Sequence, residues 1–260
     1  MCLGRYVTVT EGLALAAAGV VAGVISTVVG LASVVSYPAL LAIGLPSLAA
    51  NMTNTVALLF TGVGAAAGSR PELAGQASRI RRLGTIAALG GGAGAALLLV
   101  TPPQTFVRVA PILIGAASLA LLAPSRQDRA PGPGAGPGHD TRSPWLLAGV
   151  AGVAVYIGYF GAAGGIVMLA LLIAMVAEPL ARVNAVKNML GAIANAVAAV
   201  AFAVFGHVDW AAVVPLAGGF LVGGWTGPAL VRRIPGRVLR IGVAVCGLAV
   251  AVKLGISAYG

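Results

Sequence analysis

A lysine and two asparagines recur at helical spacing in the apolar stretch 181–205. Lys187, Gly191 and Asn195 follow one another at four-residue steps, with Asn188 beside them. Residues four apart lie on one face of an α-helix, so these residues form one polar-to-small stripe. A charge inside a membrane segment usually faces a cavity or a partner, and a cation flanked by amides there would bind an anion. The alternative is that Lys187 snorkels to the nearby interface.

A second polar group lies at the start of the apolar stretch 48–68. Asn51, Thr53 and Asn54 offer neutral hydrogen-bonding groups, which cost less to desolvate than charges. They are candidates for contacts with a substrate. The alternative is structural, with Asn51 or Thr53 capping the helix that follows Pro46.

Two apolar stretches, 12–45 and 145–177, are too long for one membrane crossing and barely long enough for two. Both are interrupted near the middle, where glycine and proline disfavour a continuous helix. Each stretch is therefore predicted to be a broken helix or a hairpin of two short helices. Breaks at membrane depth are tolerated around protein-lined cavities, where half-helix N-termini can hold an anion, although a simple packing kink is the alternative. The interrupting residues are Gly30, Ser33, Ser36 and Pro38 in the first stretch, and Gly158, Gly161, Gly164 and Gly165 in the second.

The composition places these segments in a lipid bilayer. Hydrophobic residues make up 59% of the 260-residue chain and charged residues only 8%, whereas a soluble domain carries about 25% charged residues. The net charge of +10 does not indicate a nucleic-acid partner, because the arginines cluster between apolar stretches, as in cytoplasmic loops. The chain is predicted to be an all-α polytopic protein of the cell membrane with about eight spans, or up to ten helical segments counting the broken helices. The apolar stretches are 12–45, 48–68, 83–100, 105–123, 145–177, 181–205, 210–230 and 238–258.

The chain divides into two similar halves. A Pro/Gly-rich linker, 124–144, separates a first repeat, 1–123, from a second, 145–260. Each half has a broken stretch, a span containing asparagine and two further spans. Pro46 followed by Asn51 parallels Pro179 followed by Asn184, and Lys187 takes the position of Asn54. Weak internal symmetry of this kind is typical of duplicated transporters.

The distribution of basic residues indicates that the halves are inverted. With eight simple crossings, the 16 lysines and arginines divide almost evenly between the two sides. When each broken stretch counts as two passes, in and out, only Arg5, Arg108 and Lys253 fall on the minority side. The positive-inside rule favours this second count, with both termini outside and the linker inside. It does not decide whether the doubled pieces cross fully or re-enter.

No enzyme or metal-site signature is present. The two histidines lie in the linker and a short loop, and no His/Cys/Asp/Glu cluster has metal-ligand spacing, so we expect no metal, cofactor or enzyme activity. The glycines at 90–92 lie inside an apolar helix and favour close helix packing. All six acidic residues lie at span ends or in loops, with Glu178 and Asp209 at helix starts. Without a mid-membrane carboxylate, a cavity holding Lys187 prefers an anion.

The order of these features resembles the sulfite exporter TauE/SafE family over nearly the whole chain. The matching residues include Gly23, Gly30, Pro38, the run Gly44-Leu45-Pro46, Thr53-Asn54, the break YIGYFGAAGG, Lys187, Asn195, Phe202, Gly223-Gly224 and Arg232-Arg233. The chain departs from the family pattern at Gly30-Leu31-Ala32-Ser33, where a run of glycines is usual, and at Ser26, where many members are acidic. The resemblance implies a transporter of sulfite, sulfonates or other small anions, and by analogy an exporter.

The leading hypothesis is therefore a secondary transporter that exports a small sulfur-containing anion across the cell membrane. The alternative is a membrane scaffold or assembly factor that transports nothing. The expected partners of the transporter are the lipid bilayer and the anion, and a homo-oligomer is compatible with the sequence. The candidate substrate-binding residues are Gly30, Ser33, Asn51, Thr53, Asn54, Gly164, Gly165, Lys187, Asn188 and Asn195.

Overall fold

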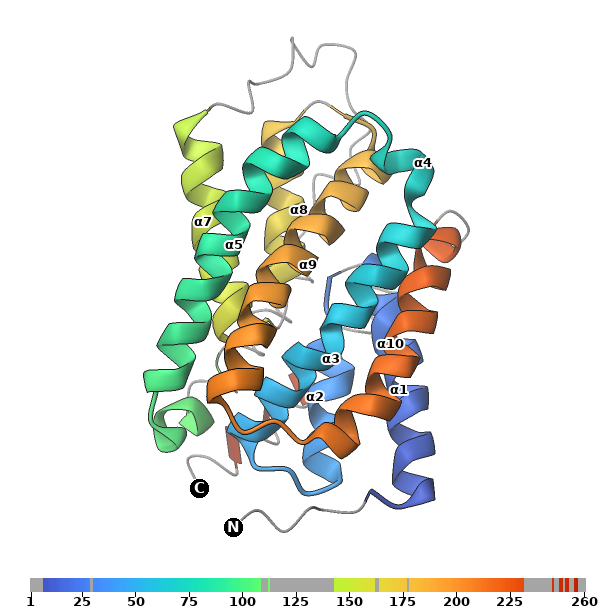
Figure 1. The fold of residues 1–260 in the computed structure, drawn as a ribbon, viewed down its shortest axis with the longest axis vertical. Coiled ribbons are helices and arrows are strands. Elements are labelled where there is room, and N and C mark those ends of the chain that lie inside the picture. The colour runs from blue at the N-terminus through green and yellow to red at the C-terminus, as the bar shows by residue number, and fades with distance from the viewer. Residues whose placement is uncertain are drawn as a thin grey trace.

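The computed structural model describes residues 7–28, 30–108, 143–161, 164–176 and 178–231, with isolated positions at 112, 245, 248, 249, 251, 252, 255 and 256. Every regular element in these ranges is a helix (Figure 1). The all-α prediction is therefore confirmed for the described residues. The helices are α1 (Val9–Val28), α2 (Ser33–Ala42), α3 (Ser47–Gly68), α4 (Arg70–Leu73), α5 (Ala77–Val100), α7 (Pro144–Tyr159), α8 (Gly164–Met175), α9 (Leu180–Phe205) and α10 (Trp210–Val231).

Five of these helices, α1, α3, α5, α9 and α10, are long and apolar enough to cross a membrane. Large apolar side chains such as Leu89, Val200 and Trp225 are exposed on the sides of the bundle. A surface of this kind fits lipid rather than water. The structure is that of a multi-pass membrane protein. Most of the predicted spans 105–123 and 238–258, and almost all of the predicted linker, lie outside the described residues.

Both long apolar stretches are broken, as predicted, and each forms a helical hairpin. The first contains α1 and α2, and the second contains α7 and α8. Gly30 has φ +88° at the first break and Gly161 has φ +73° at the second. Only glycine takes this left-handed conformation without strain. The second hairpin begins at Pro144, one residue earlier than expected, because proline suits the first position of a helix.

The two hairpins enter the bundle from opposite ends. In Figure 1, α1 rises from the lower end and α2 returns toward it, whereas α7 descends from the upper end and α8 returns there. With 10 to 16 residues, α2, α7 and α8 are too short to span a bilayer. The sequence left open whether the doubled pieces cross or re-enter, and α1 alone among these four hairpin helices is long enough to cross.

Glycine allows the helices to pack closely. In lipid, helix association depends on close contact between small residues rather than on the hydrophobic effect. Gly19 and Gly23 of α1 lie against Gly219 and Gly223 of α10, and a Cβ atom added at Gly19 would lie 2.5 Å from the Leu216 carbonyl oxygen.

The glycines at 90–92 have the same role, as predicted. Gly90 of α5 lies against α7, and Gly91 lies against Ala194 of α9. Thus α1 packs on α10 of the other half, and α7 packs on α5 of the other half. The two halves of the chain interlock.

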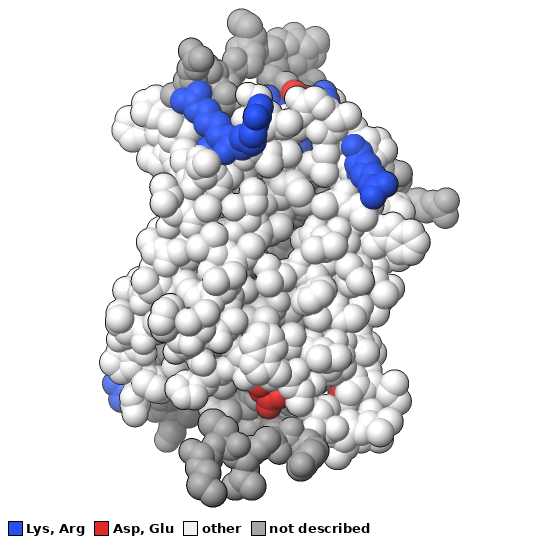
Figure 2. Space-filling view, in the orientation of Figure 1, with Lys and Arg blue, Asp and Glu red and all other residues white. Residues whose placement is uncertain are grey.

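On the face shown in Figure 2, the exposed charged residues lie toward the two ends of the bundle and the surface between them is apolar. Arg79 and Arg182, at the starts of α5 and α9, both form ion pairs with Glu178, at N–O distances of 3.3 and 3.1 Å. Arg182 also donates to the Ala74 carbonyl oxygen. The basic end is therefore the one where α5 and α9 begin, and α1 and α10 begin at the opposite end (Figure 1).

Candidate functional site

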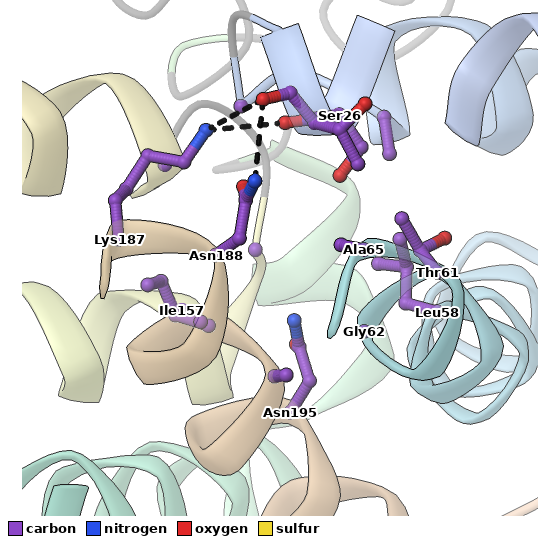
Figure 3. Close-up of a pocket in the computed structure, with 16 residues that line it drawn as sticks. Ser26, Leu58, Thr61, Gly62, Ala65, Ile157, Lys187, Asn188 and Asn195 are labelled. Carbon is purple, nitrogen blue, oxygen red and sulfur yellow. Dashed lines mark hydrogen bonds between the residues drawn. The ribbon is translucent and has the colours of Figure 1, made fainter. Parts of the chain in front are cut away.

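One face of α9 binds the C-terminal end of α1. Asn184 Nδ2 donates to the Thr27 carbonyl oxygen at 2.9 Å. Lys187 Nζ lies 3.3 Å from the Ser26 carbonyl oxygen and 3.4 Å from that of Thr27, and Asn188 Nδ2 also donates to Thr27 (Figure 3). The last four carbonyls of a helix have no partner within the helix, and here the break exposes them inside the bundle. The polar stripe of α9 satisfies two of them.

Lys187 is buried, with 2% of its surface exposed. The snorkelling alternative is therefore wrong, and the cavity interpretation of the stripe fits the structure. Within the described ranges, Lys187 is the one charged residue classed as buried. The hydrogen-bond acceptors recorded for it are the two α1 carbonyl oxygens and no carboxylate. A cation near a helix C-terminus is stabilised by the helix dipole, but a dipole neutralises only part of a full charge.

A cavity of about 60 Å³ adjoins this lysine. One water molecule needs only roughly 10–15 Å³ of such volume, so a small polyatomic ion fits. Both hairpins and two spans contribute to its walls. Its polar and glycine lining consists of Ser26, Thr27, Gly30, Thr61, Gly62, Gly161, Gly165, Lys187, Asn188, Gly191 and Asn195.

The hairpin tips touch backbone to backbone at one edge of the cavity. A Cβ atom added at Gly30 would lie 2.6 Å from Gly165 Cα, and one added at Gly165 would lie 2.5 Å from Gly30 Cα. Any side chain at either position would separate the tips. Gly191, in contrast, has open space where a Cβ atom would lie. Gly191 therefore leaves room between Lys187 and Asn195 on the α9 face.

The comparison with protein families decides the family of this chain. The model for the sulfite exporter TauE/SafE family matches residues 15–254. The chain belongs to this family. No curated protein and no solved structure matches it. The resemblance inferred from the motifs is confirmed, and with it the assignment to a family of membrane transporters.

In this TauE/SafE chain, five of the ten candidate residues line the cavity and five do not. Gly30, Gly165, Lys187, Asn188 and Asn195 line it. The other five hold the surrounding backbone and side chains in place, and their contact with a substrate stays a prediction. These are Ser33, Asn51, Thr53, Asn54 and Gly164.

Asn51 binds the C-terminal end of α7, the first helix of the second hairpin. Its Nδ2 donates to the carbonyl oxygen of Tyr159, the last residue of α7, at 3.1 Å. Asn54 donates to Ser33 Oγ at 3.1 Å, at the start of α2. Thr53 Oγ1 accepts from the Asp209 backbone amide at 3.0 Å.

These positions exclude the capping alternative for the second polar group. Helix α3 begins at Ser47, so Asn51 and Thr53 are interior residues rather than caps. Asp209, in contrast, starts a helix as predicted, because its Oδ1 accepts from the Ala212 amide at 3.0 Å.

Asn195 keeps free hydrogen-bonding capacity. Its Oδ1 is buried and has no hydrogen-bond partner among the described residues. Figure 3 shows the side chain standing up from α9 into the space beside Gly62 of α3. An unpaired buried carbonyl oxygen is unfavourable, so a ligand or water molecule that donates a hydrogen bond would satisfy it.

Sequence reasoning missed several site residues. Asn184 could have been found, because Pro179 precedes it at the spacing that separates Pro46 from Asn51. Ser26 and Thr27 contribute backbone carbonyl oxygens, which no side-chain pattern reports. Thr61 lies deep in an apolar helix without a companion motif, and its hydroxyl has no partner in the described residues.

Proposed function

We propose that this protein is a secondary transporter that exports sulfite, a sulfonate or a related small sulfur-containing anion across the cell membrane. The observation that carries the proposal is the buried Lys187, which lines a small cavity at the crossing of two helical hairpins. Because no carboxylate lines this cavity among the described residues, an anion is the ligand that would complete the electrostatics. Membership of the TauE/SafE family supports transport of sulfur anions.

The proposed architecture is a pair of inverted repeats with about eight spans. Corresponding asparagines support it: Asn51 of the first half binds the α7 end, and Asn184 of the second half binds the α1 end. The left-handed glycines Gly30 and Gly161 mark the two breaks. Inverted repeats that place broken helices around a midplane site are a recurring transporter design.

The proposed orientation puts the basic end in the cytoplasm and both termini outside. Arg79 and Arg182 lie at that end, together with the exposed Arg70 and Arg81. The positive-inside rule supports this assignment. Export would then carry the anion from the basic end to the end where α1 and α10 begin.

In the proposed mechanism, the anion binds between the hairpins, and movement of one hairpin opens the cavity to one side at a time. Lys187 supplies the charge, while Asn188 and Asn195 donate amide hydrogen bonds. Asn51, Thr53, Asn54 and Ser33 hold the hairpin ends and would reach the anion when a tip moves. Gly30, Gly164 and Gly165 allow the tips to approach the anion closely with their backbone.

The test is efflux of radiolabelled sulfite, thiosulfate and taurine from proteoliposomes. We expect flux of at least one of these by the wild type, and its loss in Lys187→Met, which keeps the length of the side chain. Arg81→Met is the matched control, because Arg81 is exposed at the basic end, and it should transport like the wild type. No flux of any of the three by folded protein would exclude this substrate class. Normal transport by Lys187→Met would exclude the proposed site.

A further inference from the structure

The partial charges of the helix ends around the cavity cancel one another. All four hairpin helices end or begin at its walls: Thr27 near the end of α1, Ile157 near the end of α7, Ala32 before α2 and Gly165 in the first turn of α8. A helix C-terminus carries about −0.5 of a charge and an N-terminus about +0.5. Two of each cancel, since both hairpins contribute one of either sign.

Lys187 remains as the unbalanced charge. It is buried and bound only to backbone carbonyl oxygens in the described ranges. The other polar groups of the lining, such as Asn188, Asn195 and Thr61, are neutral amides and hydroxyls. The described lining therefore carries one positive charge.

From this balance, we propose that the cavity selects small anions with a single negative charge, such as sulfonates and hydrogen sulfite, over dianions of the same shape. A monoanion neutralises Lys187, whereas a dianion leaves one negative charge buried without compensation, which is strongly unfavourable. The volume of about 60 Å³ excludes a large hydration shell that could screen the second charge. The inference rests on the proposed anion-binding function and adds the charge state of the substrate.

Methanesulfonate and sulfate test this selection, because both are tetrahedral sulfur oxyanions of similar size with one and two charges. Their binding to the purified protein in detergent is measured by calorimetry at one neutral pH and one ionic strength. We expect methanesulfonate to bind at least about tenfold more tightly, because the second charge of sulfate has no partner. Equal binding, or tighter binding of sulfate, would overturn the selection while leaving anion transport intact. Binding of neither anion by folded protein would overturn the proposed function itself.

Two variants separate the charge effect from a general effect on the fold. Asn195→Lys adds a second cation on the Lys187 face of α9 and should shift the preference toward sulfate. Ser78→Lys is the matched control, since it adds the same charge at an exposed position at the start of α5, and it should keep the wild-type preference.

Lys187→Met should weaken methanesulfonate binding by at least about tenfold, because the bound monoanion then loses the charge that neutralises it. If folded Lys187→Met binds methanesulfonate as tightly as the wild type, Lys187 does not neutralise the anion and the inference is wrong.

Discussion

The carbonyl oxygens at the C-terminal ends of α1 and α7 are bound by different numbers of side-chain donors. Both helices stop inside the bundle and expose carbonyl oxygens there. The α1 end receives Asn184, Lys187 and Asn188 from α9. Among the described residues, Asn51 of α3 is the one side chain that binds the carbonyl oxygen of the last residue of α7. Asn54, which takes the position of Lys187 in the proposed repeat, instead binds Ser33. The two helix ends are thus bound differently, and the difference places one full charge beside the cavity.

The largest effect is expected where the two hairpins touch. Gly30→Ala would put a Cβ atom 2.6 Å from Gly165 Cα in a left-handed backbone, whereas Gly161→Ala meets its nearest atom at 3.4 Å. Left-handed strain and overpacking together should lower the free energy of unfolding by about 3 kcal/mol or more at Gly30, and strain alone by about 1–2 kcal/mol at Gly161. Thermal unfolding in detergent measures both. Equal losses would mean that the tips do not touch as described.

The next effect concerns the charge that distinguishes the two halves. Lys187→Asn gives the second half the residue of the first, and an amide can still donate to the α1 carbonyls. We expect the protein to fold. Its transport should fall by about two orders of magnitude, because the buried anion loses its partner charge at a cost of about 3 kcal/mol or more. Efflux from proteoliposomes measures it, with Arg81→Asn as the exposed control. Wild-type flux through Lys187→Asn would show that the halves are functionally equal.

A smaller effect is expected at the two asparagines that bind the helix ends, where the loss of unfolding free energy should be greater for Asn51→Ala than for Asn184→Ala. Asn51→Ala leaves the Tyr159 carbonyl oxygen without its donor and should cost about 1–3 kcal/mol of unfolding free energy. Asn184→Ala leaves Lys187 and Asn188 on Thr27, so we expect a loss of about 1 kcal/mol or less. Chemical unfolding of both variants gives the comparison. A larger loss for Asn184→Ala would indicate that the three donors act as one unit.

The smallest effect is expected at the basic end, where Glu178, between α8 and α9, forms an ion pair with Arg79 of α5. Partial burial alone would raise the pKa of Glu178, but the charges of Arg182 and Arg79 and hydrogen bonds from Gln76 and Arg79 lower it below its usual 4.5. A lowered pKa contributes stability above the unfolded value, and that stability is lost as the pH falls through the folded value. Since the pair is partly exposed, we expect Glu178→Gln to cost less than about 1 kcal/mol at neutral pH.

Unfolding of Glu178→Gln and wild type between neutral pH and acid measures this contribution. If Glu178 is the group that titrates, the difference in stability should begin to shrink near pH 4.5 and disappear below the lowered pKa of the folded protein. A constant difference across the whole range would assign the effect to packing instead.

The sequence predicted the local features of the fold well. Apolar length and interrupting glycines predicted both broken stretches, because a hairpin inside a membrane needs a long apolar segment and a residue that tolerates positive φ. Four-residue spacing placed Lys187 and Asn195 on one face, and both line the cavity. The contact between Gly30 and Gly165 was not predictable, since the two lie in different halves and no periodicity links them.

The long-range bonds of the site were also beyond the sequence. Asn51 binds a carbonyl oxygen 108 residues away, and every residue type offers the same carbonyl group. The interlocking of α1 with α10 and of α7 with α5 depends on matched glycine faces, whose partners cannot be read from either helix alone. The sequence therefore suggests a substrate for the amides of Asn51 and Asn54, because only the fold shows their backbone and serine partners.

The contact between Gly30 and Gly165 also limits genetic repair. When a large side chain damages a packed core, a smaller residue opposite it can restore the fit. Here each tip meets the other with backbone atoms, so neither position has a side chain that a second mutation could shorten. A suppressor of Gly30→Ala would have to move a whole hairpin, and such suppressors should arise on the α10 and α5 faces that support the hairpins rather than at the tips.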